Sequence, residues 1–265
     1  RTHVRHTVIF FVFLVSNIGG MLTPLGDPPL FLGYLQGVPF TWTFRLLPHW
    51  GFQVLLLLAL YFLWDRRQYA REPVGARSRD RTQVEPLRLS GAFNFVALAL
   101  VVLAVAFLTA PWREAAIVLL AALSFWRTPS AIRQANGFTA HPILEVAVLF
   151  LGIFLTMIPA LELLRLRGGE LGVREPWHFF WASGLLSSFL DNAPTYLVFL
   201  ALGQSLGLSP EIVGVPHAIL AAISVGAVSM GANSYIGNAP NFMVKSSAEE
   251  PGGQMPRFFG YSLYS

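Results

Sequence analysis

Two carboxylates lie in stretches of the sequence that are otherwise apolar. Asp27 follows Leu25-Gly26 and precedes two prolines, and Asp191 lies between two long uncharged runs. A charged side chain at membrane depth is costly, so an acid in such a place favours a functional role. Hydroxyl and amide side chains surround both acids, and oxygen atoms are the ligands that hard cations prefer. The pattern predicts a site for an ion or for an ion-coupled substrate.

The first acid belongs to a motif that occurs twice. Residues 20–31 and 231–242 align at an offset of 211 positions. Gly, Gly, Pro and Phe recur identically in the two copies, and Thr/Ser, Leu/Ile and Asp/Asn recur as close pairs. Each copy interrupts an apolar segment with Gly and Pro. Two matched breaks are typical of the repeated halves of a membrane transporter.

The candidate residues for binding an ion or substrate share a place within these breaks. They are Ser16, Asn17, Thr23, Gly26 and Asp27 near the start, Asp191, Asn192 and Thr195 in a middle break, and Asn233, Ser234, Asn238 and Asn241 near the end. Candidate ligands for Na⁺ are Asn17, Asp27, Asp191, Asn192 and Asn233. Neither a serine-hydrolase nor a zinc-protease motif occurs, so no catalytic residue is predicted.

The composition indicates what must position these residues. Apolar side chains make up 54% of the 265 residues and charged ones 12%, and the mean hydropathy is +0.57. A soluble core of this size could not bury so much apolar surface, so the sequence predicts an all-α, multi-pass membrane protein in contact with the lipid bilayer. A cytosolic enzyme is excluded. The basic residues behind the net charge of +4 lie mostly in loops, where positive charge sets the membrane topology, so nucleic acid is not an expected partner.

The chain divides into three parts. Residues 1–64 are interpreted as the end of a first repeat, 65–90 as a linker with seven arginines, and 91–265 as most of a second repeat. The arginines predict a cytoplasmic linker. The repeat partner of Asp191 would precede the first residue, so we expect the chain to be an internal piece of a longer transporter. We expect the protein to lie in the inner membrane of a bacterium. Whether it forms a homodimer is left open.

The residues of the first break resemble a known family. Ser16-Asn17-Ile18-Gly19-Gly20, followed by residues 23–29 (Thr-Pro-Leu-Gly-Asp-Pro-Pro), is similar to the first re-entrant hairpin of the ion transporter superfamily. Within that superfamily, the chain looks most like the citrate-transporter-like group, whose members are commonly called sodium:proton antiporters. The second copy departs from the first in having Asn238 at the position of Asp27.

The resemblance implies an inverted-repeat secondary transporter. We expect re-entrant hairpins around residues 16–31 and 233–245 and a broken transmembrane helix at 191–195, related by a pseudo-two-fold axis in the membrane plane. Their tips should meet at the membrane midplane, where substrate and coupling ion bind, and should bring Asp27, Asp191 and Asn233 towards one cavity.

The charges of the site favour one function and leave another open. The breaks contain two carboxylates and no arginine, which would repel a di- or trianion. A carboxylate that exchanges a proton for Na⁺ makes the two ions compete, so cation/proton antiport by alternating access is the favoured prediction. Ion-coupled uptake of citrate or another carboxylate is the alternative. No cofactor is expected besides Na⁺ or H⁺ as transported or coupling ions, and a channel is disfavoured because it does not need matched breaks.

Overall fold

The computed structural model describes residues 4–82, 89–208, 211–249 and 255–265. Within these residues all regular structure is helical, apart from one antiparallel bridge between Ile212 and Val215. The chain forms two compact units, one of residues 1–83 and 156–265 and the other of residues 84–155. The prediction of an all-α protein is confirmed.

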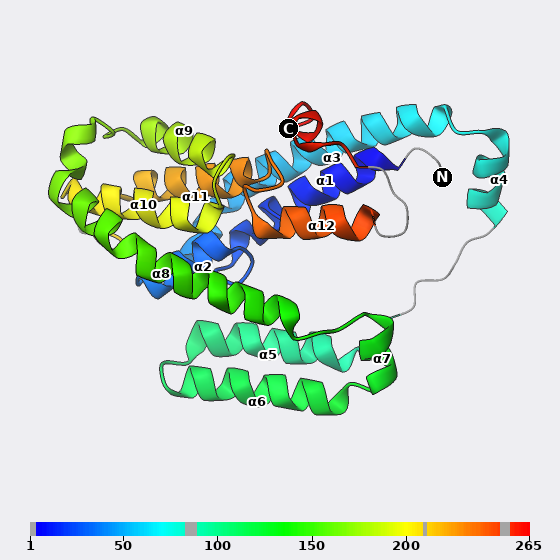
Figure 1. Cartoon of the computed structure of the whole chain (residues 1–265), viewed down its shortest axis with the longest axis horizontal. Helices are drawn as coiled ribbons and strands as arrows, with labels where there is room; N and C mark the ends of the chain where they lie inside the picture. The colour runs from blue at the N-terminus through cyan, green and yellow to red at the C-terminus, as the bar shows by residue number, and fades with distance from the viewer. Residues whose placement is uncertain (1–3, 83–88, 209–210, 250–254) are drawn as a thin grey trace. The chain divides into compact units, whose positions relative to one another are not determined.

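The helices follow one another along the chain as in Figure 1. The first unit begins with α1 (Arg5–Leu14), the 3₁₀ helix η1 (Ile18–Leu22), α2 (Pro28–Leu35), η2 (Phe40–Leu46), α3 (Leu47–Ala70) and α4 (Val74–Thr82). The second unit contains α5 (Phe93–Phe107), α6 (Trp112–Arg127), α7 (Ser130–Ala135) and the start of α8 (His141–Arg167). The first unit then resumes with η3 (Gly168–Leu171), α9 (Pro176–Ser187), α10 (Asn192–Ser205), α11 (His217–Gly231), α12 (Ala239–Glu249) and α13 (Phe258–Ser262).

Three helical stretches of the described residues are long and apolar enough to cross a membrane, namely 5–22, 40–70 and 146–164. In α3, large apolar side chains such as Phe52, Leu55 and Phe62 are more than 60% exposed. Exposed apolar area on this scale is stable only against lipid or another apolar surface. The helices therefore support the prediction of a membrane protein.

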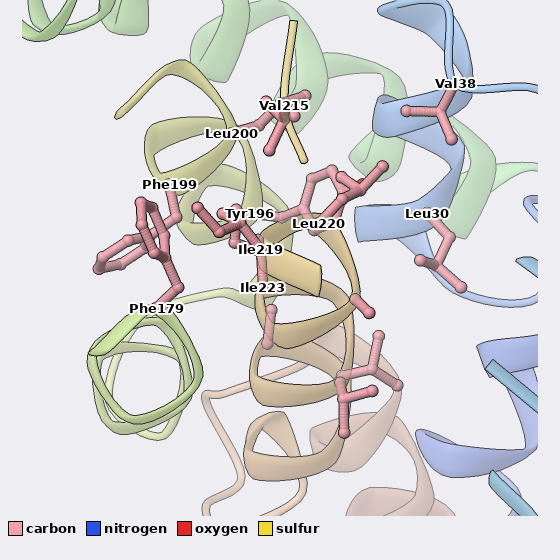
Figure 2. Packing of buried hydrophobic residues seen from close by; sticks show 14 of the residues in the cluster. Leu30, Val38, Phe179, Tyr196, Phe199, Leu200, Val215, Ile219, Leu220 and Ile223 are labelled. Atoms are coloured by element: carbon pink, nitrogen blue, oxygen red, sulfur yellow. The ribbon is translucent and has the colours of Figure 1, made fainter. Parts of the chain in front are cut away.

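The larger hydrophobic core joins α2, α9, α10 and α11 (Figure 2). Tyr196 of α10 and Leu220 of α11 are fully buried in it, and Phe179 of α9 meets Phe199 of α10 edge to face. The α9 and α11 backbones approach closely: a Cβ on Gly226 would lie 2.5 Å from the carbonyl oxygen of Phe180. This packing fixes the ends of the helices that flank the second and third breaks.

A second core holds α1 against α3 and the last part of the chain. Phe10 and Phe13 of α1 are buried, and they stack at angles on Tyr61 and Tyr261 respectively. The hydroxyl of Tyr261 donates to the carbonyl oxygen of Ala232, 2.8 Å away, in the third break. The first and third breaks are thus held within one unit by the same core.

The predicted linker is partly helical. Helix α3 continues to Ala70 beyond the boundary placed at residue 64, and α4 occupies residues 74–82. Arg77 stabilises the turn between them, because its side chain donates to the carbonyl oxygens of Ala70 and Glu72 at 2.8 and 2.9 Å. Residues 83–88 of the linker lie outside the described residues. The three-part division of the chain stays a prediction.

The form predicted for the breaks is shown only in part. At residues 188–191 the chain turns between α9 and α10, two helices that contact each other. Hairpins at 16–31 and 233–245 would fold neighbouring helices together, and the structure does not show them: α1 packs on α3 and α12, α2 packs on α10, and α11 packs on α9. The partners differ because the apolar faces of these helices belong to the two separate cores.

Candidate functional site

Each of the three breaks ends at the start of a helix. Helix α2 begins at Pro28 after Asp27, α10 begins at Asn192 after Asp191, and α12 begins at Ala239 after Asn238. Pro28 suits a first helical position, because its fixed φ angle is helical and the missing N–H would have no partner there. Asp27, Asp191 and Asn238 therefore stand directly before helix N-termini, where backbone N–H groups lack intrahelical partners.

Asp27 joins the three breaks. Its side chain is 2% exposed, and its two carboxylate oxygens accept hydrogen bonds from two different segments. Asn238 Nδ2 donates to Oδ1 at 2.9 Å, and Asn192 Nδ2 donates to Oδ2 at 3.1 Å. Among the described residues, no lysine, arginine or histidine forms an ion pair with Asp27. A buried carboxylate is thus held by neutral donors alone.

Asparagines from the first and third breaks extend this network. Asn17 Nδ2 donates to Asn241 Oδ1 at 2.7 Å and to the carbonyl oxygen of Val12 at 2.8 Å. Asn241 Nδ2 in turn donates to the carbonyl oxygens of Gly231 and Ser234, each 2.9 Å away. Asn17, Asn192, Asn238 and Asn241 are all fully buried, so the side chains of the network are shielded from solvent.

Two oxygens of the network lack a donor. Within the described residues, Asn192 Oδ1 and Asn238 Oδ1 are buried and accept no hydrogen bond. Both belong to amides whose nitrogens bind Asp27. An unpaired buried acceptor costs about 1–3 kcal/mol, so a cation or a donor group at these oxygens would stabilise the site. Amide and carboxylate oxygens are suitable ligands for Na⁺.

The N-termini of α2, α10 and α12 meet at this network. The backbone N–H of Asn192 donates to the carbonyl oxygen of Gly237 at 3.0 Å, which ties the start of α10 to the third break. The carboxylate of Asp27, which precedes α2, contacts Asn192 at the start of α10 and Asn238 just before α12. Each helix N-terminus carries a partial positive charge of about half a unit, so three of them favour an anion nearby.

Close backbone contacts shape the first and third breaks alike. A Cβ on Gly26 would overlap the carbonyl oxygen of Gly20, and a Cβ on Gly237 would lie 2.5 Å from the carbonyl oxygen of Gly231. These two pairs occupy the same positions in the two copies of the motif. The recurring glycines therefore have a physical role, since only glycine leaves room for the chain to pass itself here.

Asp191 is oriented differently from Asp27. It caps α10, because its Oδ1 accepts a hydrogen bond from the backbone N–H of Ala193 at 2.9 Å. Thr195 Oγ1 donates to the backbone carbonyl of Asp191 at 2.9 Å. Asp191 is half-buried and directly precedes Asn192, whose side chain donates to Asp27. The two acids lie in one region without a shared hydrogen bond.

The remaining candidates lie around the network rather than in it. Ser16 and Thr23 contribute carbonyl oxygens, which accept from Asn238 Nδ2 and the N–H of Gly26. Ser234 Oγ accepts from the N–H groups of residues 236 and 237 and so shapes the third break. Asn233 Nδ2 donates to Ser188 Oγ at 3.0 Å. It lines a cavity of about 500 Å³ whose lining includes neither acid, and a single cavity shared by Asp27, Asp191 and Asn233 stays a prediction.

Two serines were missed by the sequence reasoning. Ser187 Oγ donates to the carbonyl oxygen of Ala227 at 2.7 Å, and Ser188 Oγ lies 3.1 Å from the carbonyl oxygen of Met230. Both serines hold the second break against the end of α11. Their position directly before a break was the available signal, but polar residues in a small-residue run are also common in helix packing.

Comparison with known proteins agrees with the resemblance found in the sequence. No curated protein and no solved structure matches the chain. Residues 1–265 match the family described as "Putative citrate transport". The match covers the whole chain, so the prediction that the protein is a transporter and not an enzyme is confirmed. The chain belongs to this citrate-transporter-like family of membrane proteins.

Proposed function

We propose that the protein moves citrate or a similar carboxylate anion across the membrane, coupled to Na⁺ or H⁺. The observation that carries the proposal is the meeting of three helix N-termini at Asp27, Asn192 and Asn238. Their combined dipoles attract a carboxylate group. The family description supports the same substrate class. The carboxylate alternative is therefore preferred over the cation/proton antiport that the two acids favoured.

The charges of the site account for the coupling. Asp27 and Asp191 bring two negative charges towards three partial positive ones, so a citrate anion needs companion cations. The carboxylate of Asp27, with the donor-free oxygens of Asn192 and Asn238 beside it, offers oxygen ligands for Na⁺. A proton on Asp27 would serve the same purpose. Binding of the cation and of the anion would then each favour the other.

We extend the proposal to the architecture of an inverted repeat. The helices that follow the first and third breaks begin at Pro28 and Ala239, which are 211 positions apart like the motifs themselves. In the proposed transporter these halves are related by a two-fold axis in the membrane plane, and alternating access rocks the site between the two faces. The arginine-rich segment 65–90 lies in the cytoplasm of a bacterial cell.

The candidate residues divide into two groups under this proposal. Those that bind or position the coupling cation are Asn17, Asp27, Asn192, Asn238 and Asn241. Those that face the anion or shape the breaks are Ser16, Thr23, Gly26, Asp191, Thr195, Asn233 and Ser234. The division follows from the contacts: the first group forms the buried network around the unpaired carboxylate, and the second lies in the turns beside it.

The experiment is uptake of radiolabelled citrate by the full-length protein in proteoliposomes. Three conditions are compared: an inward Na⁺ gradient, an inward proton gradient, and no gradient. We expect accumulation only with one of the gradients, and its loss in Asp27→Asn. Citrate that merely equilibrates without dependence on either cation would contradict ion-coupled transport.

A specific observation keeps the antiport as a second candidate. The breaks contain two acids and no arginine, which suits a site for cations alone. The same vesicles, loaded with a pH-sensitive dye, distinguish the two functions. Na⁺-driven proton movement without citrate, together with no citrate uptake, would establish antiport and reject the carboxylate proposal.

A further inference from the structure

One face of α3 changes from apolar to basic along its length. The residues of this face recur every three or four positions and therefore form one stripe on the helix. They are Gln53, Leu57, Leu60, Trp64, Arg67 and Arg71. The apolar part is followed by an aromatic residue and then by two arginines, which is the order that a phospholipid presents from its acyl chain to its headgroup.

Two cavities follow this stripe and adjoin each other. The first, of about 500 Å³, is lined by Gln53, Leu57 and Trp64 of α3 and also by Phe10 and Phe13 of α1. The second, of about 450 Å³, runs from Leu60 and Trp64 to Arg67 and Arg71. Leu60 and Trp64 line both cavities, and we call these two adjoining cavities the path along α3.

The basic end of this path has no acid of its own. Among the described residues, neither Arg67 nor Arg71 forms an ion pair with an acidic side chain. The two acids nearest in sequence are otherwise placed: Asp65 Oδ1 lies 2.9 Å from His6 Nε2, and Glu72 is 2% exposed. Two guanidinium groups one helical turn apart suit a phosphate, whose oxygens accept paired hydrogen bonds from arginine.

The length of the apolar part matches one leaflet. Gln53 and Trp64 are eleven positions apart, which corresponds to about 16 Å along a helix. One leaflet contributes about 15 Å of the hydrocarbon core. With Trp64 at the interface, the stripe therefore ends near the membrane midplane, where Gln53 is already bonded to Ser229 Oγ at 2.7 Å and needs no ligand.

We infer that this path binds one anionic phospholipid, with its phosphate between Arg67 and Arg71 and an acyl chain in the apolar cavity. The acyl chain of the lipid would end beside Ser229, near the end of α11, and beside Asn233 in the third break. The lipid would then contact the break itself and influence its movement. The inference concerns lipid binding and does not depend on which ion or anion is transported.

Native mass spectrometry of the purified full-length protein tests the inference. Phosphatidylglycerol with long acyl chains is compared with phosphatidylcholine of the same chains and with dioctanoyl phosphatidylglycerol. We expect long-chain phosphatidylglycerol to bind most tightly. In the variant Arg67→Gln/Arg71→Gln, its affinity should fall by about 30-fold, since each arginine near an anionic headgroup contributes about a factor of five. Arg66→Gln is the matched control, because Arg66 lines neither cavity and should bind as the wild type does.

A second variant tests the acyl-chain cavity. Leu60→Trp places a larger side chain where the two cavities adjoin, and it should weaken binding of the long-chain lipid more than of the dioctanoyl lipid. Thermal unfolding confirms that each variant is folded. Equal binding of phosphatidylcholine, an equal loss in Arg66→Gln, or displacement of the lipid by millimolar inorganic phosphate would each overturn the proposal. The last outcome would indicate a site for soluble phosphate instead.

Discussion

Asn238 donates a hydrogen bond of 2.9 Å to Asp27, and these two residues occupy the same position in the two copies of the repeated motif. Equivalent residues of two halves touch each other only where they lie on the axis that relates the halves. In the inverted repeat that we propose, this pair is therefore expected to lie at the axis. It also brings the one acid of the motif against its amide counterpart.

The difference between the two copies follows from their partners. Asn238 Nδ2 lies within hydrogen-bonding distance of three oxygens: the carbonyl of Ser16, Oδ1 of Asn17 and Oδ1 of Asp27. An ionised acid at position 238 could not donate to any of them. Asp27 faces only donors. One acid and one amide at the equivalent positions satisfy the site, whereas two acids would not.

The variant Asp27→Asn should lose coupled uptake. Asparagine keeps the shape of the side chain but carries no charge, and one of its ends would bring an amide NH₂ against the donor of Asn192 or Asn238. We expect a loss of about 1–3 kcal/mol in the free energy of unfolding from this mismatch. Citrate uptake and thermal unfolding of the same preparation measure the two effects. Normal, gradient-dependent uptake by Asp27→Asn would show that this charge does not serve the coupling.

The variant Asn238→Asp should be destabilised more than Asp27→Asn. It removes three donor contacts and places a second carboxylate 2.9 Å from the first. Uncompensated buried charge costs about 3–5 kcal/mol, so we expect a lower yield of folded protein and a lower unfolding temperature. Asn233→Asp is a suitable control, because Asn233 bonds to a hydroxyl and not to an acid. If Asn238→Asp and Asn233→Asp both unfold at the wild-type temperature, the pairing of Asp27 with Asn238 contributes little to the free energy of unfolding.

The sequence was sufficient to predict the class of the protein, while its site stays a prediction. Long apolar stretches predicted an all-helical membrane protein. The matched breaks drew attention to the segments of Asp27 and Asn238, and the separate middle break to that of Asn192. The offset of 211 also matched the helix starts at Pro28 and Ala239. These features are local in the sequence: a proline or glycine in an apolar run disrupts a helix wherever it occurs in the fold.

Other features depended on tertiary packing and could not be predicted. The partners of α1 and α12 are set by which apolar face meets which core, and periodicity alone does not identify a partner helix. The orientation of Asp191 towards its own helix, rather than towards Asp27, depends on the turn at 188–191. Gln53 gave no signal at all, because a single polar residue in a transmembrane run has no pattern to reveal its partner.

The variant Gly237→Ala should destabilise the third break. An added Cβ would lie 2.5 Å from the carbonyl oxygen of Gly231 and 2.6 Å from that of Ser187, both backbone atoms that cannot rotate away. Overpacking of this kind costs about 1–3 kcal/mol. Thermal unfolding in detergent measures the change.

The matched control for this substitution is Gly51→Ala in α3. No atom lies within 4 Å of a Cβ built on Gly51. Alanine is the better helix former by about 1 kcal/mol, so this variant should unfold at the same or a higher temperature than the wild type. An equal response of both variants would mean that the close approach at Gly237 is not maintained in the solubilised protein.

The proposed topology predicts the accessibility of the arginine-rich linker. The chain has no cysteine, so Ser78→Cys in α4 introduces a single thiol at an exposed position. In intact bacterial cells this thiol should resist a membrane-impermeant reagent and should react after the cells are opened. Rapid labelling from outside would show that the orientation is opposite to the proposed one, because the seven arginines between residues 65 and 90 would then lie outside the cell.

The last prediction separates two roles of Asp191. As a helix cap, it accepts a hydrogen bond from Ala193, and asparagine can accept the same bond. As a charge in the transport site, it affects ion binding, and asparagine removes that charge. Asp191→Asn should therefore unfold at the wild-type temperature while losing coupled transport. Asp191→Ala should lose transport and also about 1 kcal/mol of stability, because alanine cannot cap α10.

Both variants are measured in the same two assays, gradient-driven citrate uptake and Na⁺-induced pH change. If Asp191→Asn transports normally and Asp191→Ala is merely less stable, Asp191 is a helix cap and Asp27 is the only acid of the site with a transport role. If Asp191→Asn changes the number of cations that accompany each citrate, the charge of Asp191 contributes to the coupling. The ratio of Na⁺ to citrate uptake distinguishes these outcomes, since removal of one negative charge from a shared site should lower the number of bound cations.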